Sequence, residues 1–388
     1  MNNAASPAQA KETILFVGFN QDAGCFTCGT SAGFRIFNTF PFKDTFHRGT
    51  KAYLKITIMN IEFDGGIGIV EMLYRTNIIA LVGGGDSPKY PPNKVMLWDD
   101  SQMKCIGELN FKQEVRGVRL RKDKIIVVLE NKTYVYNFQN LKMAEVVETS
   151  SNLKGLCAMS PSKDVCVMAC PEKKVGSVRV IHFDKGNKTL MINAHQSSLA
   201  ALSLNSEGNI LATASDKGTL IRLFDTDTGS QIQEVRRGSD HADVYCISFD
   251  PVSRFLACSS DKGTIHIFSI RADVHLAAQS KRDLCELNAA NEEEPNKQQN
   301  LQKEDTSSNN TKSMLSFMKG VLPKYFDSEW SFAQFRIIDS SAICAIRDNK
   351  VIAISKEGNY YLADIDPKAG GECKKIQQRG LIQEEGAQ

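Results

Sequence analysis

The sequence predicts an all-β protein, and more closely a seven-bladed β-propeller of the WD-repeat type. Three observations indicate this fold: short β-like stretches fill the chain, helical periodicity is almost absent before residue 270, and one hairpin unit recurs. The clearest copies of the unit, 209–225 and 254–268, each combine an apolar strand, an Asp-Lys-Gly turn and an alternating strand. The turns at Asp216 and Asp261 are 45 residues apart, a spacing typical of four-stranded propeller blades.

Five weaker copies of the hairpin accompany these two. We expect them at 25–37, 78–98, 125–138, 165–183 and 351–365. Seven hairpins predict a closed ring with few open sheet edges. A pair of β-sandwiches is the alternative, and it explains the strands but not the recurrence of the hairpin. The propeller is expected over 12–366, between a disordered N-terminus (1–11) and a C-terminal tail (367–388).

One polar segment, 276–330, interrupts the pattern within the sixth blade. Its composition cannot bury enough apolar area to offset the entropy of ordering, which predicts a flexible, membrane-facing loop. Near its end, apolar residues recur at helical spacing between a candidate N-cap, Ser313, and Pro323, and predict a short amphipathic helix. The residues expected to insert into a membrane surface are Met314, Leu315, Phe317, Met318, Val321, Leu322, Tyr325 and Phe326. Alternatively, this apolar face covers a hydrophobic patch of the propeller.

Composition excludes several classes of function. With 47 basic and 45 acidic residues the net charge is +2, so any anion must bind at a local site rather than by bulk attraction. No run of eighteen apolar residues predicts a transmembrane helix, and the N-terminus lacks the features of a secretory signal. The eleven cysteines form no regular framework, which indicates reduced thiols in the cytoplasm. We expect no metal and no other cofactor.

No motif predicts an enzyme. Gly29–Gly33 matches the nucleophile-elbow pattern, but a strand rather than a helix follows, so Ser31 belongs to a hairpin turn. Cys25 and Cys28 have no second pair at zinc spacing. Gly83–Gly85 lacks the lysine that follows in a phosphate-binding loop.

The most informative stretch is the arginine pair Arg236 and Arg237, which lies between the two clearest hairpins. Successive side chains of an extended chain point to opposite sides, so each arginine can serve its own pocket, and Gly238 lets the chain turn away. The planar guanidinium group binds phosphate through two parallel hydrogen bonds. The alternatives are a solvated loop, or arginines that form ion pairs with Asp240 and Asp243.

Residues 235–238, Val-Arg-Arg-Gly, resemble the [F/L]-R-R-G signature of the PROPPIN family. These proteins, which include the WIPI proteins, are seven-bladed WD-repeat propellers that bind phosphoinositides. Valine replaces Phe or Leu at the first position and retains an apolar anchor. Residues 93–99, 212–224 and 322–330 are also similar, and the resemblance covers 12–366, closest to the branch of the third and fourth human-type WIPI members.

The resemblance implies binding of phosphatidylinositol 3-phosphate and the 3,5-bisphosphate at two pockets beside the arginine pair. The first would comprise His195, Thr213, Ser215, Thr219, Arg222 and Arg236. The second would comprise Arg237, His241, Ser259, Ser260, Thr264 and His266. For the first set the alternative is an internal network of the kind that joins His to Ser or Thr within propeller blades, here His195 to Ser215.

The resemblance also implies a peripheral adaptor. It would be cytoplasmic, and recruited to phagophore, endosomal or vacuolar membranes, where it brings autophagy machinery. A lipid-transfer protein of autophagy would dock on the second and third blades, where loop 83–93 exposes Pro88, Tyr90, Pro91 and Pro92. Alternatively this loop is a stiff linker, and the protein is a soluble WD-repeat scaffold without lipid binding. We expect a monomer and no nucleic-acid partner.

Overall fold

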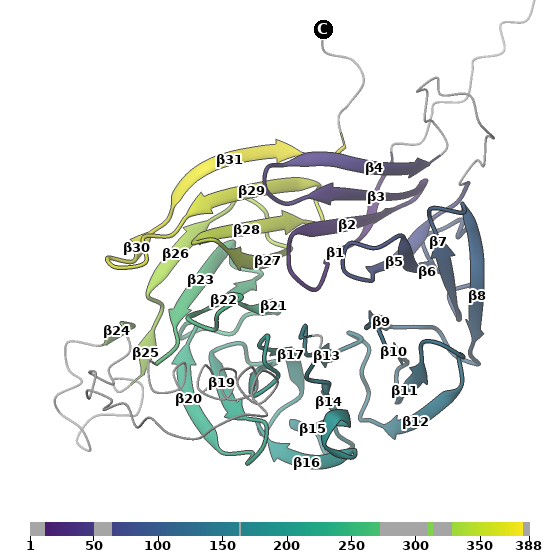
Figure 1. Ribbon diagram of the computed structural model, residues 1–388. Coiled ribbons are helices and arrows are strands. Elements are labelled where there is room, and N and C mark those ends of the chain that lie inside the picture. The colour runs from purple at the N-terminus through teal and green to yellow at the C-terminus, as the bar shows by residue number, and fades with distance from the viewer. Residues whose placement is uncertain (1–11, 50–63, 163, 272–308, 313–327, 383–388) are drawn as a thin grey trace, which may run out of the picture.

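Seven sheets form a ring in the computed structural model, and the first strand of each blade lies nearest the centre (Figure 1). The structure describes residues 12–49, 64–162, 164–271, 309–312 and 328–382. The predicted seven-bladed propeller is confirmed. None of the helical segments in the described ranges has the length and apolar character needed to span a bilayer.

Each blade is a meander of antiparallel strands. Blade 1 comprises β1 (Ile14–Phe19), β2 (Cys25–Thr30), β3 (Gly33–Asn38) and β4 (Lys43–Gly49). Blade 2 comprises β5 (Ile67–Met72), β6 (Ile78–Gly83), β7 (Lys94–Asp99) and β8 (Lys104–Asn110). Blade 3 comprises β9 (Gly117–Leu120), β10 (Lys124–Val128), β11 (Lys132–Asn137) and β12 (Met143–Glu148). Blade 4 comprises β13 (Ala158–Met159), β14 (Val167–Pro171), β15 (Ser177–His182) and β16 (Lys188–Asn193), with a 3-10 turn, η1, at Phe183–Lys185.

The remaining blades surround the candidate site. Blade 5 comprises β17 (Leu199–Leu204), β18 (Ile210–Ser215), β19 (Leu220–Asp225) and β20 (Gln231–Arg236). Blade 6 comprises β21 (Val244–Phe249), β22 (Phe255–Ser260), β23 (Thr264–Ser269) and β26 (Ala333–Arg336), with β30 (Gly371–Glu372) added in parallel to β26. Blade 7 comprises β27 (Ala342–Arg347), β28 (Lys350–Ser355), β29 (Asn359–Asp364) and β31 (Lys374–Gly380).

The recurring hairpin is the second and third strand of every blade. All six residues of β18 and of β22 are buried, because neighbouring blades cover both faces of these strands. Gly218 and Gly263 turn the two clearest hairpins at φ angles of 65° and 66°, in the left-handed region that favours glycine. Burial and turn chemistry together explain why this unit was visible in the sequence.

Two short pieces of the polar insertion are ordered against the ring. β25 (Glu329–Trp330) pairs in parallel with β20, and β24 (Thr311–Lys312) pairs with β25. The side chain of Asn310 fixes this addition, since its Nδ2 donates to the Ser269 oxygen (2.7 Å) and its Oδ1 accepts from the Ser269 N–H (2.6 Å). The prediction of one flexible loop over 276–330 is therefore wrong at these residues. The amide side chain of Asn310 bonds to the main chain of Ser269 as a neighbouring strand would, and it holds the short strands β24 and β25 to the blades.

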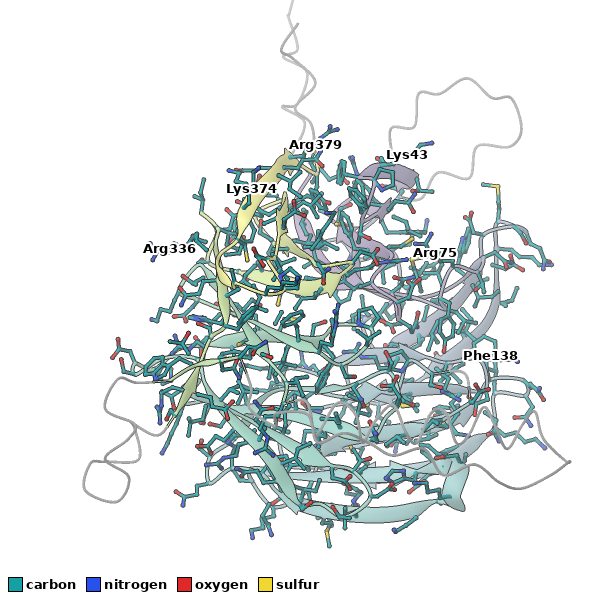
Figure 2. All side chains as sticks on the ribbon, turned by 60° about the vertical axis from the view of Figure 1, so that its left-hand side comes forward. Lys43, Arg75, Phe138, Arg336, Lys374 and Arg379 are labelled. Atoms are coloured by element: carbon teal, nitrogen blue, oxygen red, sulfur yellow. The ribbon has the colours of Figure 1, made fainter. Side chains whose placement is uncertain are left out.

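The seventh blade ends inside the segment that was expected to be a tail. β31 pairs with β29 and forms the rim of the blade, so the tail assignment for 367–388 is wrong over 374–380. Figure 2 shows Lys374 and Arg379 at this outer edge. The strand reads Lys-Lys-Ile-Gln-Gln-Arg-Gly and is almost entirely exposed, so it has no apolar alternation to predict it.

The ring closes by packing of blade 7 against blade 1, each of which is built from its own stretch of chain. Tyr360 lies 6.1 Å from Phe26 between ring centroids, and Phe26 stacks on Phe37 at 4.8 Å. The Tyr360 hydroxyl donates to the main-chain oxygen of Thr39 at 2.6 Å. Stacked aromatic rings and a buried hydrogen bond thus join the first blade to the seventh.

Candidate functional site

The arginine pair ends the outer strand of blade 5, at the junction with blade 6. Arg236 is the last residue of β20, and its Nε donates to the Ser328 hydroxyl at 2.8 Å. The main-chain N–H of Arg237 donates to the Thr219 oxygen at 2.9 Å, and its guanidinium donates to the main-chain oxygens of Gly218, at 2.7 Å, and Asp240. The two side chains therefore reach different neighbours.

The charge of Arg237 is buried and is held by main-chain oxygens. The residue is 6% exposed. Within the described ranges, no carboxylate forms an ion pair with its guanidinium, so pairing with Asp240 or Asp243 is not observed there. Carbonyl dipoles satisfy the N–H groups without neutralising the positive charge, which remains available to an anion.

Gly238 follows the end of β20, and the chain bends at Ser239 and Asp240 without a left-handed glycine. The φ of Gly238 lies outside the left-handed region, and a Cβ there would meet no heavy atom within 4 Å. Neither conformation nor crowding within the chain requires glycine. The residue instead leaves open space directly after the arginine pair.

Part of the first predicted pocket comes together around His195. Its Nε2 lies 3.0 Å from the Thr213 hydroxyl, and Arg222 donates from Nη1 to the Ala194 oxygen (2.6 Å) and from Nε to Glu234 (2.8 Å). Burial, and then the Arg222 charge, lower the pKa of His195 from 6.5 to about 4. The ring is therefore neutral at pH 7. The hydroxyl that it contacts is that of Thr213, not that of Ser215.

Ser215 and Thr219 flank the β18–β19 turn. Ser215 is buried and its main-chain oxygen accepts from the Gly218 N–H, while Thr219 is half-buried. Glu234 offsets the charge of Arg222. Arg236 is the other arginine of this set, and its Nε donates to the Ser328 hydroxyl. The internal network expected between His195 and Ser215 is therefore not the one observed, which joins His195 to Thr213.

The residues of the second predicted pocket differ in burial and in hydrogen-bond partners. Burial, and then the Arg237 charge, lower the pKa of His266 from 6.5 to about 4, and its Nδ1 lies 3.3 Å from the Ser331 hydroxyl. Ser259 is committed elsewhere, because its hydroxyl donates to the Ala342 oxygen of blade 7 at 2.6 Å. Ser260 is buried, and its hydroxyl has no partner within the part of the chain that is described. His241 is exposed and Thr264 is half-buried at the start of β23.

Sequence reasoning missed the contact of Ser328 and the anchoring of Glu329. Gln233 Nε2 donates to Glu329 Oε2 at 2.8 Å, and Asn310 Nδ2 donates to the same oxygen at 2.9 Å. No local pattern signals contacts across 92 to 96 residues of chain. The predicted insertion residues, Met314, Leu315, Phe317, Met318, Val321, Leu322, Tyr325 and Phe326, lie outside the described residues, as do Ser313 and Pro323.

A second candidate site lies at the loop between β6 and β7. Pro88, Pro91 and Pro92 are exposed as expected, but Tyr90 is half-buried and packs against the core between blades 1 and 2. The main chain of Tyr90 lies directly against Gly83, where an added Cβ would meet the Tyr90 oxygen at 1.6 Å.

This loop borders a cavity of about 310 Å³. The cavity is lined by Gly68, Ile69, Val82, Gly83, Gly84, Gly85, Pro88, Pro92, Glu114, Val115 and Arg116. The loop is tied down on both sides, since the Gly66 N–H donates to the Ser87 oxygen (2.7 Å) and the Val115 N–H donates to the Pro92 oxygen (2.9 Å). An open cavity with a glycine-lined wall, bordered by the charged residues Glu114 and Arg116, suits a side chain that combines apolar and polar groups. Across the described ranges, no group of three or more His, Cys, Asp or Glu side chains is arranged to hold a metal ion.

Comparison with known proteins gives consistent matches. A family model described as PROPPIN matches residues 13–281. Autophagy-related protein 18e of Arabidopsis thaliana is 34% identical over 376 residues, which cover 96% of this chain and 89% of that protein. Autophagy-related protein 18 of Dictyostelium discoideum is 31% identical over 382 residues, which cover 96% and 95%.

Solved structures share the fold. Hsv2 of Kluyveromyces lactis superposes with a TM-score of 0.68 at 22% identity, over 96% of this chain and all of that chain. KlAtg21, solved in complex with a coiled coil of AgAtg16, gives a TM-score of 0.67 at 21% identity, over 95% of this chain and all of that chain.

Proposed function

Because the chain belongs to the PROPPIN family, we propose that it is a phosphoinositide-binding peripheral membrane adaptor that recruits autophagy machinery. Its lipids are phosphatidylinositol 3-phosphate and phosphatidylinositol 3,5-bisphosphate, and it acts by binding rather than by catalysis. The names of its relatives, autophagy-related proteins, support the process. The headgroup sites are the two sets of residues beside Arg236 and Arg237.

One observation carries this proposal: adjacent arginines at the junction of blades 5 and 6 direct their guanidinium groups to different neighbours. Arg237 keeps an un-neutralised charge at a buried position, and Gly238 leaves space beside it. A phosphate that replaces the carbonyl partners would form charge-assisted hydrogen bonds, each contributing about 1.5–3 kcal/mol. Two such sites on one rim would strengthen membrane binding about 10²-fold or more through effective concentration.

The histidines add a pH dependence. His195 and His266 are neutral in the free protein because their pKa values are near 4. A phosphate dianion beside either ring would raise that pKa, so binding would take up a proton and affinity would increase as pH falls. The increase would begin at a lower pH than for an exposed histidine.

The test is vesicle flotation with the double variant Arg236→Thr and Arg237→Thr. Binding to vesicles that contain phosphatidylinositol 3-phosphate should be lost, while the thermal unfolding temperature stays close to that of the unmodified protein. A matched control removes the same two charges from the rim of blade 7, Lys374→Thr with Arg379→Thr (Figure 2). This control should float normally. Unchanged flotation of the arginine-pair variant would refute the proposed site and favour a scaffold that binds only proteins.

We further propose that the cavity beside Pro88 and Pro92 receives a protein partner, a lipid-transfer protein of autophagy. The match to a propeller solved with a coiled coil supports protein partners in general. Arg116→Glu would reverse the charge of an exposed residue in the cavity wall, and should weaken capture of the purified partner while vesicle flotation is retained. Capture that this change does not weaken would remove the cavity from the partner site.

A further inference from the structure

Two cysteines lie close together where blades 6 and 7 meet. Cys246 lies on β21 and Cys344 on β27, the innermost strands of their blades. The Cys246 Sγ donates to the main-chain oxygen of Cys344 at 3.4 Å. The buried cluster between these blades contains Cys344, and Cys246 packs against the same cluster. Both side chains therefore belong to one interface, and the Cys246 thiol contacts the main chain of Cys344 itself.

The two thiols are chemically unequal. Cys246 is partly exposed, whereas Cys344 is fully buried. Hydrogen bonding with the Cys344 side chain lowers the pKa of the Cys246 thiol against the opposing effect of burial, and the Cys344 carbonyl and the Arg119 charge lower it further. The interaction with the Cys246 side chain, and then burial, raise the pKa of the Cys344 thiol. Cys246 is thus the more nucleophilic and the more accessible of the two.

A third cysteine provides a contrast. Cys258 lies on β22 and belongs to the cluster between blades 5 and 6, so it faces away from Cys344. Its Sγ lies 3.8 Å from the Ser259 oxygen, and burial raises its pKa to about 12. It is a buried thiol that packs in a different interface from Cys246 and Cys344.

We propose that Cys246 and Cys344 are a redox-active pair that hydrogen peroxide converts to a disulfide. The Cys246 thiolate attacks one peroxide oxygen and the O–O bond breaks, which gives a sulfenic acid and releases hydroxide that takes up the thiol proton as water. The Cys344 sulfur then attacks the sulfenic sulfur, its proton leaves with the hydroxyl as a second water, and the S–S bond forms. Two thiols are oxidised and one peroxide is reduced.

The resulting bond would link strands 98 residues apart in the chain. Because it would join the innermost strands of two blades, it would restrict separation of blade 7 from blade 6 in the unfolded chain. The oxidised protein is therefore expected to unfold at a temperature several degrees higher than the reduced protein. This consequence does not depend on lipid binding.

The experiment treats the purified full chain with hydrogen peroxide, blocks the remaining thiols with N-ethylmaleimide in denaturant, and maps the peptides by mass spectrometry without reduction. A linked peptide that joins Cys246 to Cys344, removed by dithiothreitol, is the expected result. Cys258→Ser should retain this peptide and Cys246→Ser should lose it. Cys344→Ser should instead trap a sulfenic acid on Cys246 that dimedone labels. Recovery of both cysteines as N-ethylmaleimide adducts, or oxidation of Cys246 without the link, would overturn the proposal.

Discussion

Replacement of His195 and His266 by glutamine should change how the stability of the protein responds to acid. In the folded chain the pKa of each ring is lowered from 6.5 to about 4, by burial first and then by Arg222 and Arg237 respectively. Between these pH values the unfolded chain binds protons that the folded chain does not. The free energy of unfolding contributed by these rings is therefore complete above about pH 6.5 and is lost as pH falls toward 4.

The magnitude follows from the shifts. One pKa unit corresponds to about 1.4 kcal/mol, so each ring contributes at most about 3.5 kcal/mol, and less because both rings are partly exposed to solvent. Glu71 acts in the opposite direction, since burial raises its pKa from 4.5 to about 7. Its folded form takes up a proton first, so its contribution to the free energy of unfolding increases as pH falls through that window. Unfolding takes up at most two protons at the rings and releases one at the carboxyl, a net uptake of one. The free energy of unfolding therefore changes by at most about 1.4 kcal/mol per pH unit.

The assay is urea unfolding between pH 4.5 and 7.5, followed by the fluorescence of Trp98 and Trp330. The unmodified protein should lose stability toward acid in this range. The double histidine variant should lose this slope or reverse it, because the opposing Glu71 contribution is retained. Glu71→Gln should steepen the slope. Parallel curves for the unmodified protein and the double histidine variant would refute the reasoning.

Two further predictions concern the two candidate sites. Ser328→Glu places a carboxylate beside the Arg236 guanidinium, and should weaken flotation with phosphoinositide vesicles about tenfold, whereas Ser328→Ala should not. Equal flotation of the two variants would contradict a role for this contact. Gly83→Ala forces the Tyr90 main chain away and should lower the free energy of unfolding by about 1–3 kcal/mol, measured by urea unfolding. Gly380→Ala, whose added methyl meets only an ordinary contact, is the control, and an equal loss there would exclude the proposed clash.

The sequence predicted the inner part of each blade better than its rim. Strands such as β18 and β22 are buried on both faces and end in glycine turns, so burial and turn chemistry leave a local pattern. The outer strand β31 is exposed along nearly its whole length and is specified by pairing with β29, which no local pattern reports. The tail assignment was wrong for this reason.

In the candidate site, too, only the features set by the local sequence could be predicted. The position of the arginine pair and the opposite reach of its side chains follow from the extended chain and could be inferred from the sequence. The partners of these side chains could not, because Ser328 lies 92 residues from Arg236 and Ala342 lies 83 residues from Ser259. Hydroxyl groups at similar positions are thus used differently: Ser259 joins two blades, whereas Ser260 has no partner among the described residues.

The closure between blades 7 and 1 has a consequence for biosynthesis. The hydroxyl of Tyr360 bonds to Thr39 across 321 residues, so the aromatic face of the first blade is translated long before the surface that covers it. Phe26 and Phe37, which are almost fully buried in the ring, therefore stay uncovered on the ribosome until synthesis is nearly complete. The first blade must remain soluble with an open apolar face during that interval, when chaperones that bind exposed aromatic surface have the opportunity to act.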